Sequence, residues 1–314
     1  MKYITIFLLL LTTLLAKDLK PVKEIQMHGN VMDIVIKDDI LYAGTTAGML
    51  EMYDIKKEQF IGGITLKKIH DFMGDLMQPK VYAVDVMDNR KLLLAEGENG
   101  VRELYIHENN TTTKVLAKHE LTMQKARFID KDHVFIGLLS NEILLFDLKT
   151  KKILYLLQLS ESKFSDFALS EDRTKAVISC ESGINYLVTT KDGKLVKELK
   201  GANKDNVFKV DFKKNRVSTA GQDRVGAVYD VDTGSYKTFR SDFLIYATGL
   251  SPNAQLAAFA FSIDNDIAIF DLSTDTKRYT LKGQKSTLNT IVFYDEKTIF
   301  SGSDDRYIMK WQLP

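Results

Sequence analysis

The sequence predicts an all-β fold in which one structural unit is repeated seven times. Seven aromatic residues recur along the chain, separated by 52, 41, 40, 43, 41 and 41 residues. They are Tyr53, Tyr105, Phe146, Tyr186, Tyr229, Phe270 and Trp311. Most follow a turn and close a short apolar run, as Phe146 does after Ile143-Leu144-Leu145. A repeat of about 40–45 residues is typical of β-propeller blades, so we expect a seven-bladed β-propeller.

Within each repeat the same pattern of four short apolar runs can be followed between turns. The clearest blade has runs at Val207 to Phe212, Arg216 to Ala220, Gly226 to Asp230 and Ser235 to Phe239. Its turns are rich in Gly, Asn and Asp, which tolerate the positive φ angles of tight hairpins. Four runs per repeat predict a blade of four antiparallel strands.

The first 16 residues have the features of a secretory signal peptide rather than of a blade. Lys2 supplies a positive charge, an apolar stretch follows to Leu15, and Ala16 is a small residue at a cleavage point before Lys17. About a dozen apolar residues are too few to span a bilayer, which needs ~20. We therefore expect a signal peptide at 1–16 that directs export, no stable membrane anchor and a propeller at 17–314.

Charge and cysteine content narrow the possible partners and the sources of stability. The 298 residues after Ala16 carry 42 basic and 42 acidic side chains, so their formal net charge is zero. Proteins that bind nucleic acid show a basic excess, and we expect no nucleic-acid partner here. Cys180 is the only cysteine, which rules out an internal disulfide. Stability is expected to come from packing and from closure of the ring.

The two ends of the chain are expected to share one blade. The last repeat has only three runs, at Asn289 to Tyr294, Thr298 to Ser301 and Tyr307 to Leu313. The segment from Val22 to Met27 is an apolar strand without a blade of its own. Pairing this segment beside the Trp311 strand would close the ring and remove two exposed sheet edges.

The C-terminal repeat resembles the WD40 family. The segments that carry the resemblance are Leu281 to Ile291 and Ser301 to Trp311. In that family a His, Ser, Asp and Trp form a hydrogen-bonded tetrad within a blade. The resemblance implies a tetrad of Ser301, Asp305 and Trp311, with Gln284 at the place of the His. We expect these residues to be structural, because a buried Asp needs hydrogen-bond donors and turn amides supply them.

The same pattern weakens toward the N-terminus. Asp223 and Asp264 stand six residues before their aromatic residues, and Thr219 takes the Ser position of its blade. In blades one to four the Asp position is occupied by Ala47, Asn99, Ser140 and Cys180. The propeller resemblance therefore covers the whole chain after residue 16, but its specific motifs cover only the last three blades.

No motif for catalysis, a metal ion or a cofactor stands out. The five histidines are scattered and show none of the short spacings of a zinc site. The first strands of the blades, which line a propeller channel, offer mainly Val, Ile, Phe and Ala. We therefore expect no catalytic residue, no metal and no cofactor.

An insertion between Lys68 and Lys80 is the first feature that suggests a binding role. Its apolar residues recur at the spacing of one helical face: Ile69, Phe72, Met73, Leu76 and Met77. This spacing predicts a short amphipathic helix on the face that carries the loops between blades. One interpretation is a cap, in which Phe72 and Leu76 pack on the blade beneath. The other is a partner-docking surface, which flexible methionines suit.

The second such feature is the segment Glu108-Asn109-Asn110-Thr111-Thr112. Asn110 lies in an Asn-x-Thr acceptor with an acidic residue two places earlier. This resembles the extended sequon of some Gram-negative periplasmic glycosylation systems, so Asn110 is a candidate glycosylation site. The alternative is a polar hairpin loop that matches by chance.

Three functions are compatible with these features. The first is a periplasmic, non-catalytic scaffold that helps to assemble or operate another complex. The second is a propeller enzyme of the lactonase or quinoprotein kind, and the third is a surface-exposed binding module. In its size, leader and blade number the chain resembles the NapL-type accessory proteins of periplasmic nitrate reductase systems. That resemblance implies a protein partner in the reductase system and a role in its maturation or in electron delivery.

Overall fold

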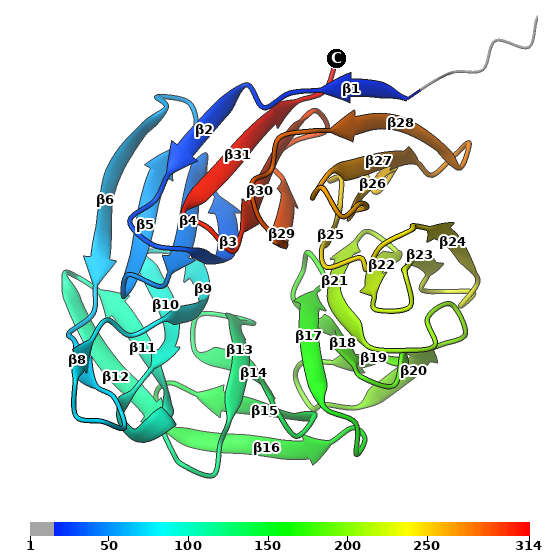
Figure 1. Cartoon of the computed structure of the whole chain (residues 1–314). Helices are drawn as coiled ribbons and strands as arrows, with labels where there is room; N and C mark the ends of the chain where they lie inside the picture. The colour runs from blue at the N-terminus through cyan, green and yellow to red at the C-terminus, as the bar shows by residue number, and fades with distance from the viewer. Residues whose placement is uncertain (1–15) are drawn as a thin grey trace, which may run out of the picture.

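A computed structural model describes residues 16–314, which form seven antiparallel blades arranged in a ring (Figure 1). First strands of neighbouring blades contact one another around the whole ring, so they line its centre. The predicted seven-bladed β-propeller is thereby confirmed. Except for Ala16, the predicted signal peptide lies outside the described residues.

The first three blades keep their strands in chain order from the centre outward. Blade one contains β3 (Val31–Lys37), β4 (Ile40–Thr45), β5 (Met49–Asp54) and β6 (Gln59–Thr65). Blade two contains β9 (Val81–Met87), β10 (Arg90–Glu96), β11 (Arg102–Glu108) and β12 (Thr111–Ala117). Blade three contains β13 (Met123–Phe128), β14 (His133–Leu138), β15 (Glu142–Asp147) and β16 (Lys152–Gln158).

The remaining blades follow the same order. Blade four contains β17 (Phe164–Leu169), β18 (Lys175–Cys180), β19 (Asn185–Thr189) and β20 (Leu195–Leu199). Blade five contains β21 (Val207–Lys213), β22 (Arg216–Gly221), β23 (Val225–Asp230) and β24 (Tyr236–Arg240). Blade six contains β25 (Thr248–Leu250), β26 (Leu256–Ala260), β27 (Ile267–Asp271) and β28 (Thr276–Leu281). Blade seven has three strands from the C-terminus: β29 (Leu288–Phe293), β30 (Thr298–Ser303) and β31 (Tyr307–Gln312).

The N-terminal segment supplies the outer strand of blade seven, as the missing fourth run predicts. Strand β2 (Lys23–Gln26) pairs antiparallel with β31. Two flanking backbone bonds extend the pairing, from Val22 N to Lys310 O (2.8 Å) and from Met27 N to Arg306 O (2.7 Å). The predicted closure by Val22 to Met27 is confirmed, and Figure 1 shows the blue β2 beside the red β31.

A carboxylate from blade one adds a charged contact across this closure. Glu58, in the turn between β5 and β6, binds the ammonium groups of Lys23 (2.8 Å) and Lys310 (2.7 Å). Hydrogen bonds from these two groups lower the pKa of Glu58 to about 2. The carboxylate therefore stays ionised at any pH near neutrality and contacts both strands at the closure.

A second N-terminal strand, which the sequence did not predict, adds a fifth strand to blade six. Strand β1 (Lys17–Leu19) pairs in parallel with the outer strand β28, and Lys282 N donates to Leu19 O (2.8 Å). Lys282 also forms an ion pair with Asp18 (2.8 Å). The start of the described chain therefore contacts two neighbouring blades.

The seven aromatic repeat residues all lie on third strands, and six of them are buried. Hydrophobic clusters fill each of the seven spaces between neighbouring blades. The closing cluster joins blades seven and one, and it includes Ile25 and Met27 together with Phe300 and Tyr53. The core is therefore a ring of inter-blade layers rather than a single centre.

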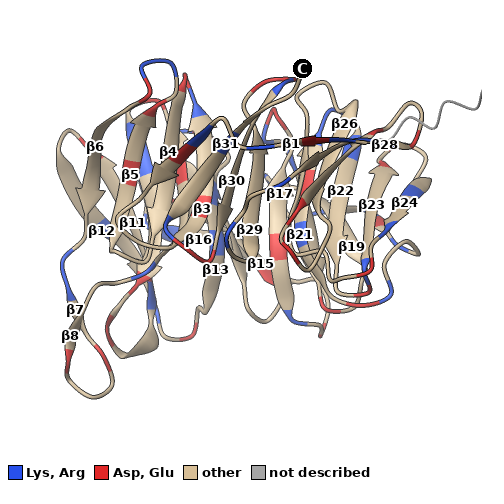
Figure 2. Cartoon of the chain, turned by 45° about the horizontal axis from the view of Figure 1, so that its top comes forward, with Lys and Arg blue, Asp and Glu red and all other residues tan. Residues whose placement is uncertain are grey.

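Within the described residues, no helix is long and apolar enough to cross a membrane. Acidic and basic segments are interspersed over the ring in Figure 2. This mixture agrees with the balanced charge of the sequence.

Candidate functional site

Blade seven contains the four residues that the WD40 resemblance singled out, joined in one hydrogen-bonded chain. Trp311 Nε1 donates to Ser301 Oγ (2.8 Å), and Ser301 Oγ donates to Gln284 Oε1 (2.6 Å). Gln284 Nε2 then donates to Ser303 Oγ (2.7 Å), which donates to Asp305 Oδ1 (2.9 Å). The glutamine amide can replace an imidazole here because it offers both an acceptor and a donor. Ser303 is the link to Asp305 that the sequence motif did not reveal.

Blade five forms a similar chain with an asparagine in the central place. Thr219 Oγ1 donates to Asn203 Oδ1 (2.6 Å), and Asn203 Nδ2 donates to Asp223 Oδ1 (3.1 Å). In blade six, by contrast, Asp264 lies exposed in the loop between β26 and β27. Asp223 is half-buried and accepts hydrogen bonds as a tetrad carboxylate would, whereas Asp264 is exposed and its position does not repeat the pattern.

We expect Gln284→Ala to lower the free energy of unfolding by about 2 kcal/mol, because the buried hydroxyls of Ser301 and Ser303 lose their shared partner. Urea unfolding followed by tryptophan fluorescence measures this change, since Trp311 is the only tryptophan. Gln222→Ala removes an exposed glutamine and serves as the control. An equal effect of both substitutions would contradict a structural role of the hydrogen-bonded series that contains Gln284.

The insertion after blade one is a β-hairpin, so the predicted amphipathic helix is wrong. Strand β7 (Ile69–His70) pairs antiparallel with β8 (Leu76–Met77). Asp71 Oδ1 accepts hydrogen bonds from the backbone N–H groups of Met73 (2.8 Å) and Asp75 (2.9 Å), and Gly74 has φ +86°. This turn is stabilised by a side chain and contains a positive φ angle, so the backbone cannot continue as the helix that the apolar spacing suggested. In Figure 2 the hairpin extends away from the ring.

The hairpin separates its five apolar residues into a buried base and an exposed tip. Ile69 is buried at the base and Met77 is half-buried. Phe72, Met73 and Leu76 are 81%, 87% and 57% exposed. Phe72 and Leu76 therefore do not cap the channel, as one interpretation of the sequence required.

Asn110 occupies the second position of a two-residue turn between β11 and β12. Asn109 and Asn110 have φ angles of 49° and 59°, and both are exposed. Two successive positive φ angles define a type I′ hairpin turn, which favours asparagine for conformational reasons alone. Glycosylation of Asn110 stays a prediction.

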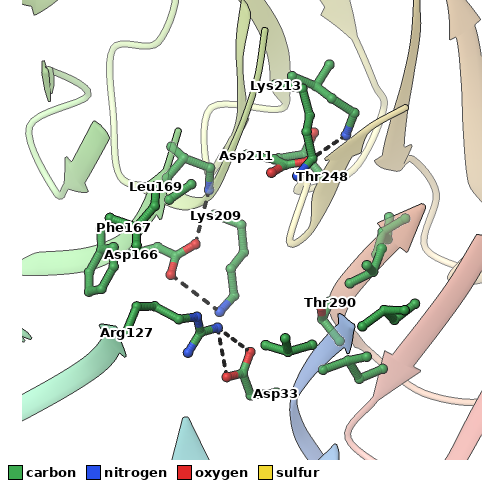
Figure 3. Close-up of a pocket in the computed structure, with 18 of the residues that line it drawn as sticks. Asp33, Arg127, Asp166, Phe167, Leu169, Lys209, Asp211, Lys213, Thr248 and Thr290 are labelled. Atoms are coloured by element: carbon green, nitrogen blue, oxygen red, sulfur yellow. Dashed lines mark hydrogen bonds and ion pairs between the residues drawn. The ribbon is translucent and has the colours of Figure 1, made fainter. Parts of the chain in front are cut away.

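One end of the central channel contains charged side chains, so the expected apolar lining is wrong there. A cavity of about 360 Å³ lies in the channel and is lined by residues from all seven first strands. It extends to the turn that follows β17, which lies on the face opposite the inter-blade loops. Figure 3 shows Asp33, Arg127, Asp166 and Lys209 pointing toward one another from different blades.

Four aspartates in the cavity each accept a hydrogen bond from the first strand of the next blade. The pairs are Asp33 Oδ2 with Val84 N (2.9 Å), Asp85 Oδ2 with Phe128 N (2.8 Å), Asp166 Oδ2 with Val210 N (3.2 Å) and Asp211 Oδ2 with Leu250 N (2.8 Å). These carboxylates connect neighbouring blades at the channel wall. Strand interiors are otherwise poor in aspartate, so its recurrence in first strands was a signal that could have revealed the site.

Ion pairs then connect blades that are not neighbours along the ring. Arg127 of blade three binds Asp33 of blade one, with Nη2 2.9 Å from Oδ1 and 2.8 Å from Oδ2. Arg173, in the turn after β17, binds Asp85 of blade two through both terminal nitrogens. Its Nη1 is 2.6 Å from Oδ2 and its Nη2 is 3.2 Å from Oδ1. Both aspartates therefore bind a guanidinium that originates across the channel.

Asp166 lies between two ammonium groups. Lys125 Nζ is 2.7 Å from Asp166 Oδ1, and Lys209 Nζ is 4.0 Å from the same oxygen. Burial alone would raise the pKa of the Asp166 carboxyl, but the two lysines outweigh it and lower that pKa. Asp166 is therefore ionised at neutral pH, and its charge is balanced inside the channel.

Among residues 16–314, no group of three or more His, Cys, Asp or Glu side chains is placed to hold a metal ion. Fold and site together define the chain as a seven-bladed β-propeller with a charged channel and a projecting apolar hairpin. No known family model matches its sequence, and no curated protein matches it at a significant level.

Proposed function

We propose that this protein is a periplasmic, non-catalytic interaction scaffold that binds a protein partner through the hairpin tip. The observation that carries the proposal is the exposure of Phe72, Met73 and Leu76 on one projecting turn. Large apolar side chains grouped at a rigid protrusion are typical of interaction sites. Two methionines in the same hairpin suit a surface that adapts to its partner.

Local hydrogen bonds support a docking role, because they fix the tip before any partner is present. Asp71 holds the turn through its side chain, and its backbone exchanges bonds with Asp75 (3.0 Å) and Gly74 (3.1 Å). His70 lies 3.3 Å from Glu98 of the short 3₁₀ turn η1 (Glu98–Gly100) in blade two. A preorganised tip loses little conformational entropy on binding, which favours affinity.

The Phe72 ring packs against Gly100, the last residue of this 3₁₀ turn. A Cβ atom at Gly100 would lie 3.1 Å from Phe72 Cζ, and Gly100 has φ +74°. A larger residue there would push the ring away and strain the backbone. The direction of the hairpin is therefore determined partly by blade two.

The partner that we propose is a subunit of a periplasmic nitrate reductase system. Support comes from the predicted leader, the size of the chain and its seven blades, in which it resembles NapL-type accessory proteins. In this role the protein assists maturation or electron delivery, and the reductase carries the redox chemistry. The chain itself needs no catalytic residue and no cofactor for such a role.

The charged channel removes one argument against a lactonase- or quinoprotein-like enzyme, because such enzymes place charged ligands around the channel. Here, however, each of the four channel aspartates is already bound to a backbone N–H of the next blade. Three of them also bind lysine or arginine. These contacts favour a structural use of the carboxylates, so the scaffold remains the proposal.

We expect a Phe72→Asp, Met73→Asp double variant to lose its partner while its melting temperature changes by less than about 2 °C, because both side chains are mostly exposed. Affinity purification of the tagged protein from the periplasm of its native host, followed by mass spectrometry, measures partner loss. Ile263→Asp is the matched control, since Ile263 is 70% exposed on a loop of blade six. Retention of the partner by the double variant, with an intact fold, would refute docking at the hairpin. A partner outside the nitrate reductase system would refute that assignment alone.

A further inference from the structure

We propose that the channel cavity binds a small oxyanion between Lys209, Lys125 and Arg127. This site lies inside the channel, apart from the hairpin tip, and is independent of the docking role. Its ligand class is an anion whose oxygen atoms accept several hydrogen bonds, such as phosphate, sulfate, nitrate or a small carboxylate.

The first argument is the charge of the cavity interior. Five cationic side chains line it: Lys125, Arg127, Arg173, Lys209 and Lys213. The acidic side chains that line it are Asp33, Asp85, Asp166, Asp211 and Glu171. Glu171 is exposed at the cavity rim, where it forms an ion pair with Lys214 (3.7 Å) outside the lining. The lining therefore carries five cations and five carboxylates, but the Glu171 carboxylate is paired with Lys214 rather than with a cation of the cavity.

The second argument is an excess of hydrogen-bond donors. Each of the four aspartates gives one oxygen to a backbone N–H, which leaves fewer acceptors for the cations. Lys125 directs one hydrogen bond to Asp166, whereas Lys209 stands too far from the same oxygen, at 4.0 Å, to donate to it. An ammonium group carries three N–H donors, so most donors of these two lysines remain available to a ligand.

The third argument is geometric. Both ammonium groups converge on one oxygen of Asp166, so they lie on the same small region of the channel wall. Arg127 is on the same strand as Lys125, two residues further along, and its guanidinium still has N–H groups beyond the two that bind Asp33 and the backbone. Figure 3 shows Arg127 and Lys209 directed into the space beside Asp166. A cavity of about 360 Å³ holds an oxyanion together with water.

Calorimetric titration of the mature protein with inorganic phosphate in a low-salt buffer tests the proposal. We expect saturable binding, and Lys209→Gln should weaken it about tenfold because one charge-assisted hydrogen bond is lost. The Lys209 side chain donates no hydrogen bond to any of residues 16–314, so the variant should keep its fold, which near-ultraviolet circular dichroism checks. Lys209→Arg should retain binding, and Lys191→Gln, an equal charge change at an exposed site, should leave it unchanged.

Separate titrations with sulfate, nitrate, citrate and chloride identify the preferred anion. A preference for one oxyanion over chloride supports a site, and the rank order separates tetrahedral, planar and carboxylate ligands. Absence of binding for every oxyanion would overturn the proposal. Equal binding by the wild type and Lys209→Gln, or an equal effect of sodium chloride, would overturn it as well.

Discussion

Deletion of residues 22–27 is expected to cost at least about 5 kcal/mol of unfolding free energy. The segment forms the outer strand of blade seven and buries Ile25 and Met27, which are 3% and 2% exposed. Loss of a buried Ile or Met side chain typically costs about 2–5 kcal/mol, and the strand's backbone bonds to β31 are lost in addition. The deletion also opens the contact of blade seven with blade one. Urea unfolding monitored by circular dichroism measures the change.

Deletion of residues 17–19 is the matched control, because β1 adds a strand to an outer edge without closing the ring. Its Lys17 and Asp18 are exposed and Leu19 is half-buried, so we expect a loss of about 1 kcal/mol. Similar losses for the two deletions would contradict closure by β2. An unchanged stability after deletion of 22–27 would do so more strongly.

The second large effect is expected for Arg127→Met, which should cost about 3–5 kcal/mol because it leaves the Asp33 carboxylate without its cation inside the channel. Asp33 would keep only the N–H of Val84 as a partner. Urea unfolding at neutral pH measures the change.

Arg306→Met provides the control for this substitution, since Arg306 is exposed. The double variant Asp33→Asn, Arg127→Met should recover part of the stability, because a neutral amide is less costly to bury than an unpaired carboxylate. If Arg127→Met costs no more than Arg306→Met, the cross-channel ion pair does not hold blades one and three together.

The blades and their closure could be predicted from the sequence because both depend on short-range patterns. Trp311 and the six aromatic residues before it mark third strands at a nearly constant period, and the missing fourth run of the last repeat required a strand from elsewhere. Strand β1 could not be predicted in this way. It has three residues, too few for an alternating pattern, and its parallel pairing with β28 depends on where β2 brings the chain.

The hairpin shows how a helical pattern can mislead over a short segment. Ile69, Phe72, Met73, Leu76 and Met77 match a helical face, but nine residues complete only two to three turns of helix. Asp71 and Gly74 form a turn between them, and local side-chain bonds of this kind compete with helix formation. The spacing therefore reflects a buried strand base and an exposed tip.

The channel site was missed because the composition of the first strands was judged as a whole. Their apolar majority packs between blades, and the few charged residues face the centre. Asp33, Asp85, Asp166 and Asp211 each stand inside an apolar run, where an aspartate is unusual enough to indicate a specific partner. Their pairing with Arg127 and with the next blade depends on the ring, which a sequence pattern does not show.

Site-specific photo-crosslinking at position 73 in the native host tests the scaffold proposal most directly. A photoreactive residue in place of Met73 occupies the exposed hairpin tip, and one in place of Ile263 occupies an exposed loop on blade six. The proposal predicts a crosslinked product between position 73 and a subunit of the periplasmic nitrate reductase system that is absent for position 263. Equal products from both positions, or none from position 73 in cells that express the reductase, would contradict it.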